Sequence, residues 1–119
     1  MENILVIDDE LMICEAISSY LKKHGFNVFT ANTGNDGLRI LKEQEISFII
    51  LDLMLPDMSG EEICSIVRSQ SRVPIIMLTA KTMEEDMING LSIGADDYIT
   101  KHLALKISTQ EYKRCQGVL

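Results

Sequence analysis

Three aspartates of this 119-residue chain follow apolar runs in a way that could bring their carboxylates together. The run 48–51 ends in Asp52, and the run 4–7 ends in Asp8 and Asp9. Short apolar runs bounded by polar residues are typical of strands buried on both faces, and the carboxyl ends of parallel strands meet at one edge of a sheet. Like charges crowded at this edge would repel one another, and a hard cation such as Mg²⁺ would offset that repulsion.

A carboxylate beside a bound metal ion can attack phosphorus, because the metal reduces the repulsion between the attacking anion and the phosphoryl oxygens. Asp52 is the candidate nucleophile. Asp8 and Asp9 would hold the metal, directly or through water, and the backbone carbonyl of Met54 could complete its coordination. These residues predict a Mg²⁺-dependent phosphoryl-transfer site.

A hydroxyl and a cation follow two later strands. Thr79 ends the run 74–78, and Lys101 ends the run 98–100. Both groups could bind the oxygens of a phosphoryl group on Asp52. Each candidate also has an ordinary explanation alone: the acid pair Asp8 and Asp9 could cap a helix, and Lys101 could be a solvated cation. Their common position at strand ends favours the functional interpretation.

Apolar periodicity predicts alternating strands and helices along the chain. Strands are expected at 4–7, 26–31, 48–52, 74–79 and 98–100, and helices at 11–24, from the end of a polar loop at 32–37, at about 60–69 and from 82 to 93. Ser59 with Glu62 and Thr82 with Glu85 form capping-box signatures. This alternation predicts a doubly wound five-stranded parallel α/β sheet with helices on both faces.

The segment 102–119 is the exception, because its apolar residues follow no single helical stripe. The register of a final helix stays open, and Ser108 and Glu111 could cap one that starts late.

Composition excludes several function classes. The net charge of -7 argues against nucleic-acid binding by this chain, and the apolar runs fall short of a membrane span. The N-terminus lacks a signal-peptide pattern, so a cytoplasmic location is expected. The three cysteines, Cys14, Cys64 and Cys115, are widely spaced in apolar segments, which indicates reduced thiols in helices and neither a disulfide framework nor a zinc site.

Four ordered motifs resemble the receiver domain of bacterial two-component response regulators. They are Val6–Glu10, Leu51–Gly60, Pro74–Ala80 and Gly94–Lys101. The residues around Asp52 and Lys101 are most similar to those of the OmpR/PhoB-type subfamily. The resemblance implies that residues 1–119 form one receiver domain with the flavodoxin-like (CheY-like) strand order 2-1-3-4-5.

The resemblance also implies a function. Asp52 would accept a phosphoryl group from a sensor histidine kinase, with Mg²⁺ held by Asp8, Asp9, Asp52 and the carbonyl of Met54. Thr79 and Lys101 would contact the phosphoryl group. A two-state switch would then move Thr79 toward it and turn Tyr98 inward, which reshapes the surface of the fourth helix, fifth strand and fifth helix.

This switched surface would control an output, transcription, through a C-terminal DNA-binding domain outside this chain. It could also form a homodimer, although Met87 stands where the subfamily commonly has a cation for pairing between subunits. The domain itself is expected to contact neither DNA nor a membrane and to be a switch, not an enzyme.

The segment after Lys101 departs from the family, which normally has Lys-Pro-Phe where this chain has Lys101-His102-Leu103. Without proline a trans peptide bond is expected, because a cis bond would cost about 2.5 to 4 kcal/mol. This difference could displace Lys101, and it keeps a phosphorylation-independent interaction module as the main alternative. A metal-dependent phosphatase would need a second acid at Met54, and a flavin-binding domain would need a first loop without the charges of Asp8–Glu10.

Overall fold

The computed structural model describes residues 2–80 and 94–115, and its side chains through Ser108. The elements are β1 (Asn3–Ile7), α1 (Leu11–Lys23), β2 (Asn27–Ala31), α2 (Gly34–Glu43), β3 (Phe48–Asp52), α3 (Gly60–Arg68), β4 (Ile75–Thr79), β5 (Asp97–Thr100) and α5 (Lys101–Cys115). The expected alternation of strands and helices is confirmed in these ranges. The predicted helix that begins at Thr82 lies outside the described residues.

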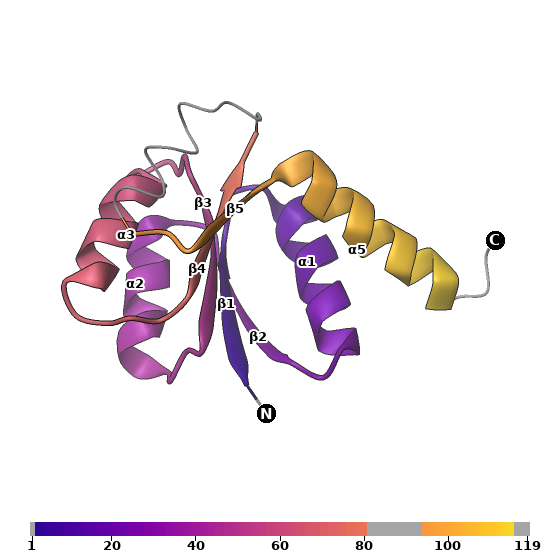
Figure 1. The fold of residues 1–119 in the computed structure, drawn as a ribbon, viewed down its shortest axis with the longest axis horizontal. Coiled ribbons are helices and arrows are strands. Elements are labelled where there is room, and N and C mark those ends of the chain that lie inside the picture. Colours follow the sequence, from indigo (N-terminus) through magenta and orange to yellow (C-terminus); the bar gives the residue numbers. More distant parts are fainter. Residues whose placement is uncertain (1, 81–93, 116–119) are drawn as a thin grey trace.

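The five strands form one parallel sheet in the order β2-β1-β3-β4-β5, as predicted. Figure 1 shows α1 and α5 on one face of the sheet and α2 and α3 on the other. Each face has its own apolar cluster: Leu5, Ile49 and Met77 belong to the cluster under α2 and α3, whereas Val6 and Leu78 belong to the cluster under α1 and α5. Because apolar side chains of β1 enter both clusters, the strand is buried on both faces.

Local signals in the sequence account for several element boundaries. Ser59 and Glu62 form the predicted capping box at the start of α3. Gly60 opens that helix directly against the Asp52 carbonyl, where a Cβ would collide with the oxygen. At the end of α1, Gly25 has φ of 90°, a backbone conformation that a residue without a Cβ adopts at low cost.

Helix α2 begins earlier than the polar composition of residues 32–37 predicts. It starts at Gly34, and the Thr33 hydroxyl caps it by accepting a hydrogen bond from the Asp36 N–H. The carboxylate of Asp57, far away in the sequence, accepts hydrogen bonds from the N–H groups of Gly34 and Asn35 at 2.8 and 2.9 Å. These acceptors satisfy the free N–H groups of the first turn, so part of the predicted loop is helical.

Helix α5 corrects the expectation of an irregular final segment and decides where the final helix starts, which the sequence left open. It begins at Lys101, directly after β5, and continues to Cys115. The Thr100 hydroxyl caps its first turn by accepting a hydrogen bond from the Leu103 N–H at 3.1 Å. Ser108 caps no new helix, since its hydroxyl donates to the Ala104 carbonyl one turn earlier. The peptide bond after Lys101 is trans, as expected.

The poor apolar stripe of α5 has a visible consequence. Among its side chains through Ser108, the buried ones are the small side chains of Ala104 and Ser108, whereas Leu103 and Ile107 are exposed. An open apolar cleft of about 240 Å³ therefore remains between α1, the sheet and α5. No helix in the described part of the chain combines the length and apolarity that crossing a membrane requires.

Arg68 joins α3 to the start of β5. Its guanidinium donates to the carbonyls of Gly94 and Val73, each at 2.7 Å, and to the Asp96 carboxylate at 2.6 Å. Its side chain is only 13% exposed.

We expect Arg68→Ala to lower the free energy of unfolding by about 2 to 3 kcal/mol, because it leaves two carbonyls and a carboxylate without this donor. Urea denaturation measures the change. Arg39→Ala is the control, since Arg39 is 57% exposed and its ion pairs with described residues, Asp36 and Glu43, lie along its own helix, and it should cost about 0.5 kcal/mol or less. Equal effects of the two substitutions would contradict the role given to Arg68.

Candidate functional site

Asp8, Asp52 and Lys101 converge at the carboxyl ends of three strands. Side chains two residues apart in a strand lie on the same face of the sheet. Two residues before Asp8, Asp52 and Lys101 stand Val6, Ile50 and Ile99, which all belong to the cluster under α1 and α5. The three side chains therefore extend toward the same face of the sheet. The register places Ile7 beside Leu51 and Asp52 beside Leu78, which brings the strand ends level.

The Lys101 ammonium is the cation that the structure places among these carboxylates. Its Nζ lies 3.0 Å from Asp52 Oδ2, 3.5 Å from Asp8 Oδ2 and 2.9 Å from Glu10 Oε1. The Lys101 side chain is 13% exposed, and those of Asp8 and Asp52 are 0% and 3% exposed. With His102 after it in place of the family's proline, Lys101 still lies beside Asp8 and Asp52.

Burial dominates the ionisation of the two aspartates. It raises the pKa of Asp52 to about 7, although the hydrogen bond from Lys101 opposes the rise. Burial likewise raises the pKa of Asp8. For Lys101, burial alone lowers the pKa, but hydrogen bonds with Glu10 and Asp52 outweigh it and raise the pKa. Among the residues that the structure describes, the site thus holds more negative charge than one ammonium compensates.

The acid cluster fits a divalent cation by its donor chemistry. Carboxylate oxygens of Asp8, Asp9 and Glu10 lie within 4.8 Å of one another. Asp8 Oδ2 is buried and accepts no hydrogen bond from the residues that the structure describes. Asp52 Oδ1 accepts one from the Met54 N–H at 3.2 Å. Coordination by the Met54 carbonyl stays a prediction.

Thr79 lies at the end of β4, next to Leu78, the register partner of Asp52. It is 2% exposed. Thr79 lies two residues after Met77 in the strand, so its side chain points to the same face, the one under α2 and α3. Tyr98 of β5 packs against the apolar cluster of that face. The two expected switch residues therefore share one face of neighbouring strands.

Sequence reasoning missed the contacts that hold the β1–α1 turn. The Asp8 carbonyl accepts hydrogen bonds from the Asn32 side-chain amide at 2.9 Å and from the Cys14 thiol at 3.2 Å. Burial raises the pKa of Cys14 to about 11, so the thiol stays protonated and can donate. Helical spacing predicts that Cys14 faces inward, and it does. Its hydrogen bond to the Asp8 carbonyl could not be predicted, because this contact depends on how α1 and β2 meet.

The pairing of Glu10 with Lys101 was also missed. In the sequence Glu10 directly follows two predicted metal ligands and looks like one more acid of the same loop. Nothing near it in the sequence indicates a contact with Lys101, which lies 91 residues further along the chain. The role of Asp57 at the start of α2 was missed for the same reason. Its hydrogen bonds with Asn35 and Gly34 lower the pKa of this exposed carboxyl.

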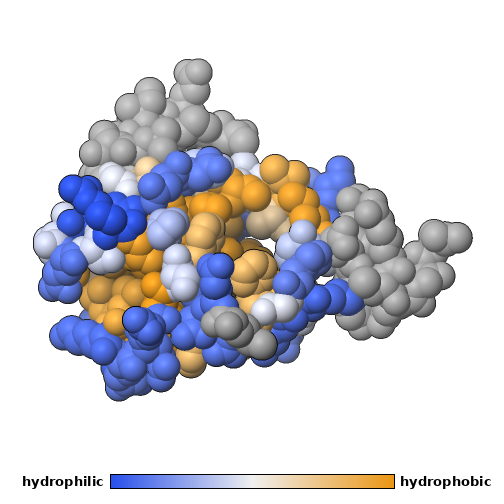
Figure 2. All heavy atoms as spheres, turned by 60° about the horizontal axis from the view of Figure 1, so that its bottom comes forward, coloured by the Kyte–Doolittle hydropathy of each residue, from blue (hydrophilic) through white to orange (hydrophobic). Residues whose placement is uncertain are grey.

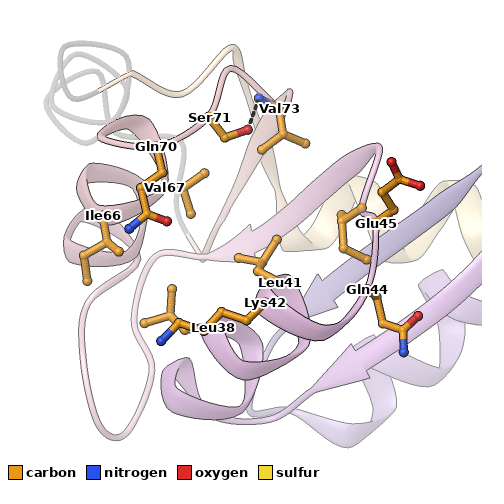
Figure 3. A pocket seen from close by; sticks show the side chains of 11 residues that line it. Leu38, Leu41, Lys42, Gln44, Glu45, Ile66, Val67, Gln70, Ser71 and Val73 are labelled. Atoms are coloured by element: carbon orange, nitrogen blue, oxygen red, sulfur yellow. Dashed lines mark hydrogen bonds between the residues drawn. The ribbon is translucent and has the colours of Figure 1, made fainter.

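A separate groove lies between α2 and α3, at the edge of the sheet where the strands begin. Its volume is about 380 Å³, and Figure 3 shows Leu38, Leu41, Ile66, Val67 and Val73 among the side chains that line it. Figure 2 turns this edge toward the viewer and shows apolar atoms between hydrophilic ones. Its charged lining residues, Lys42 and Glu45, form no cluster that suggests chemistry. The acidic edge is the candidate site.

Comparisons with known proteins agree with this geometry. Residues 4–111 match the family model described as the response regulator receiver domain. The chain is similar to the response regulator DrrB of Thermotoga maritima, an OmpR/PhoB homolog, with 36% identity and a TM-score of 0.82 over 96% of this chain and 52% of that chain. It is also similar to the chemotaxis protein CheY4 of Vibrio cholerae, with 32% identity and a TM-score of 0.83 over 100% of this chain and 99% of that chain.

A receiver domain protein (CheY-like) from Methanospirillum hungatei has 27% identity and a TM-score of 0.82, covering 96% of this chain and 92% of that one. Strand order, site geometry and family match point the same way. The chain belongs to the response regulator receiver domains of two-component systems.

Proposed function

We propose that this receiver domain is switched by phosphorylation of Asp52, with a sensor histidine kinase as the phosphoryl donor. The observation that carries the proposal is the position of Asp52: its nearly buried carboxylate ends the central strand, 3.0 Å from the Lys101 ammonium. A structural ion pair alone would not require two further acids, Asp8 and Asp9, at the neighbouring strand end.

In the proposed transfer, an Asp52 carboxylate oxygen forms a bond to phosphorus while the bond between phosphorus and the donor atom breaks. The donor atom keeps the electron pair of the broken bond. It is an imidazole nitrogen when phosphohistidine is the donor, and an oxygen of the departing acetate when acetyl phosphate is the donor. Lys101 would attract the phosphoryl oxygens, and Thr79, whose side chain follows the face under α2 and α3, would move toward them to offer its hydroxyl.

Asp8, Asp9 and Asp52, with the Met54 carbonyl, are the groups proposed to hold Mg²⁺. The buried Asp8 oxygen, which faces Lys101 at 3.5 Å but accepts no hydrogen bond from the described residues, and the all-oxygen donor set support this choice of ion. When bound, the ion would neutralise charge on the phosphoryl group and on the carboxylates.

The proposed switch links Thr79 to Tyr98. Both residues lie on the same face of β4 and β5, with Tyr98 beside Met77 and Thr79 beside Thr100 in the register. A movement of Thr79 toward a phosphoryl group would open space along this face for the Tyr98 ring. Dimer formation through the surface that includes the fourth helix stays a prediction, because residues 81–93 lie outside the described part.

We further propose that the output is transcription, through a separate DNA-binding domain. The similarity to DrrB, of which this chain covers about half, supports an additional domain in the complete protein. The net charge of -7 supports the view that the receiver does not bind DNA itself. We also propose a cytoplasmic location, because phosphoryl donors made from ATP are available there.

Intact mass spectrometry after incubation with acetyl phosphate tests the phosphoacceptor. We expect a Mg²⁺-dependent gain of one phosphoryl group in the wild-type chain and none in Asp52→Asn. Asp36→Asn, at an exposed carboxylate on α2, is the matched control and should be modified like the wild type. A folded wild-type chain that gains no phosphoryl group would refute the proposal and favour an interaction module that works without phosphorylation.

A further inference from the structure

Glu10 directly precedes helix α1, but its side chain does not cap the helix. It is the N-cap of α1, yet its side chain makes no capping hydrogen bond. The residues that commonly cap a helix are Ser, Thr, Asp and Asn, whose short side chains accept a hydrogen bond from an N–H group of the first turn. Here Glu10 Oε1 instead accepts one from the Lys101 ammonium, at 2.9 Å.

Glu10 differs from the other carboxylates that surround Lys101. Its side chain is 58% exposed, whereas those of Asp8 and Asp52 are buried. An incoming phosphoryl donor therefore meets the charge of Glu10 at the mouth of the site, ahead of the buried pair. Because the donor is an anion, the negative charge of Glu10 repels it. Glu10 also accepts a hydrogen bond from the Lys101 ammonium, the group that would otherwise attract the donor.

We propose that Glu10 is a positioning residue that competes with the phosphoryl group for Lys101 and thereby restrains phosphorylation of Asp52. In the unphosphorylated chain Glu10 holds the ammonium at the edge of the site. Transfer of the phosphoryl group, in which the Asp52 oxygen bonds to phosphorus and acetate leaves acetyl phosphate, requires the ammonium to turn from Glu10 to the phosphoryl oxygens. The inference rests on the proposed function.

Glu10→Gln tests the competition, because glutamine keeps the length of the side chain and an acceptor oxygen but removes the charge. We expect phosphorylation by acetyl phosphate to become about two- to fivefold faster, the factor that corresponds to a partly exposed ion pair. Glu15→Gln is the matched control. It removes the same charge at an exposed position of α1 and should leave the rate unchanged.

The dependence on salt separates an electrostatic role from a merely structural one. Ions screen exposed charges over about 10 Å at 0.1 M salt, so the advantage of Glu10→Gln should shrink as the salt concentration rises. A side chain that only tied α5 to the β1–α1 turn would give no faster phosphorylation at any salt concentration, because removing its charge would only loosen that contact. Equal rates in Glu10→Gln and the wild type would overturn the inference and leave the proposed function intact, whereas phosphorylation of neither protein would overturn both.

A double-mutant cycle in the metal-free protein tests the contact without any phosphoryl donor. Glu10→Gln is measured by urea denaturation in the wild type and in Lys101→Met. With Lys101 present, the substitution removes an attraction. Without Lys101, it removes only repulsion from Asp8 and Asp52, so we expect it to be stabilising. The same change in both backgrounds would mean that Glu10 does not hold Lys101, and the inference would fail.

Discussion

Replacing Lys101 with methionine should slow phosphorylation of Asp52 by on the order of 100-fold. The Lys101 ammonium lies 3.0 Å from the Asp52 carboxylate, with a second buried carboxylate, Asp8, 3.5 Å away. Methionine fills similar volume but carries no charge. The phosphoryl donor would then approach buried acids without this compensating cation, and a preorganised charge inside a partly dry site has a large effect on rate.

The measurement is the initial rate of mass gain from acetyl phosphate at a fixed Mg²⁺ concentration. Lys106→Met is the matched control, because Lys106 lies on the same helix and is exposed. Lys101→Arg should recover part of the rate, since it restores the charge but not the compact shape of the ammonium. Circular dichroism checks that each variant is folded. A rate for Lys101→Met within threefold of the wild type would contradict the role assigned to Lys101.

Lys101→Met and Glu10→Gln remove opposite ends of one ion pair, and they should change the rate in opposite directions. A contact that mattered only for folding would give losses in both variants. The comparison therefore separates a charge that acts on the phosphoryl group from a contact that only fastens α5 to the β1–α1 turn.

The fold was predictable because short-range signals and long-range packing agree in most of the chain. Continuous apolar runs in β1, β3 and β4 indicate strands buried on both faces, and the Ser59–Glu62 pair marks the start of α3. Asp8, Asp52 and Lys101 were predictable as neighbours for a related reason. They follow strands, and a parallel sheet aligns the ends of its strands.

The errors arose where a partner from a distant part of the chain decides the local structure. The first turn of α2 depends on Asp57, more than twenty residues away, and so could not be recognised in a polar, glycine-containing segment. For α5, the apolar pattern is weak, but capping by Thr100 and packing of Ala104 and Ser108 let the helix begin at once. Glu10 was missed because no local pattern links it to Lys101.

The concentration of acids at the site should reduce the stability of the domain. Burial raises the pKa of Asp52 from 3.8 to about 7, so the native environment disfavours the charged form of this side chain even with Lys101 beside it. Asparagine has nearly the same shape and no charge. We therefore expect Asp52→Asn to raise the free energy of unfolding of the metal-free protein by on the order of 2 kcal/mol at pH 8.

The sign of the pH dependence follows from proton linkage. Between pH 4 and pH 7 the native state keeps a proton on Asp52 that the unfolded chain has already lost, so the contribution of Asp52 to the stability of the wild type should fall as the pH rises through this range. Asp52→Asn should lack this contribution. Its advantage over the wild type should therefore be largest at pH 8 and disappear near pH 4.

Urea denaturation with a chelator at pH 4, 6 and 8 measures this difference, and Glu15→Gln controls for the loss of one exposed negative charge. An advantage that does not depend on pH, or a loss of stability at pH 8, would contradict the assigned cause. The expected result has a functional meaning. If removing the charge of Asp52 stabilises the fold, then that charge serves no structural purpose, and the chain tolerates its cost because the carboxylate is needed for chemistry.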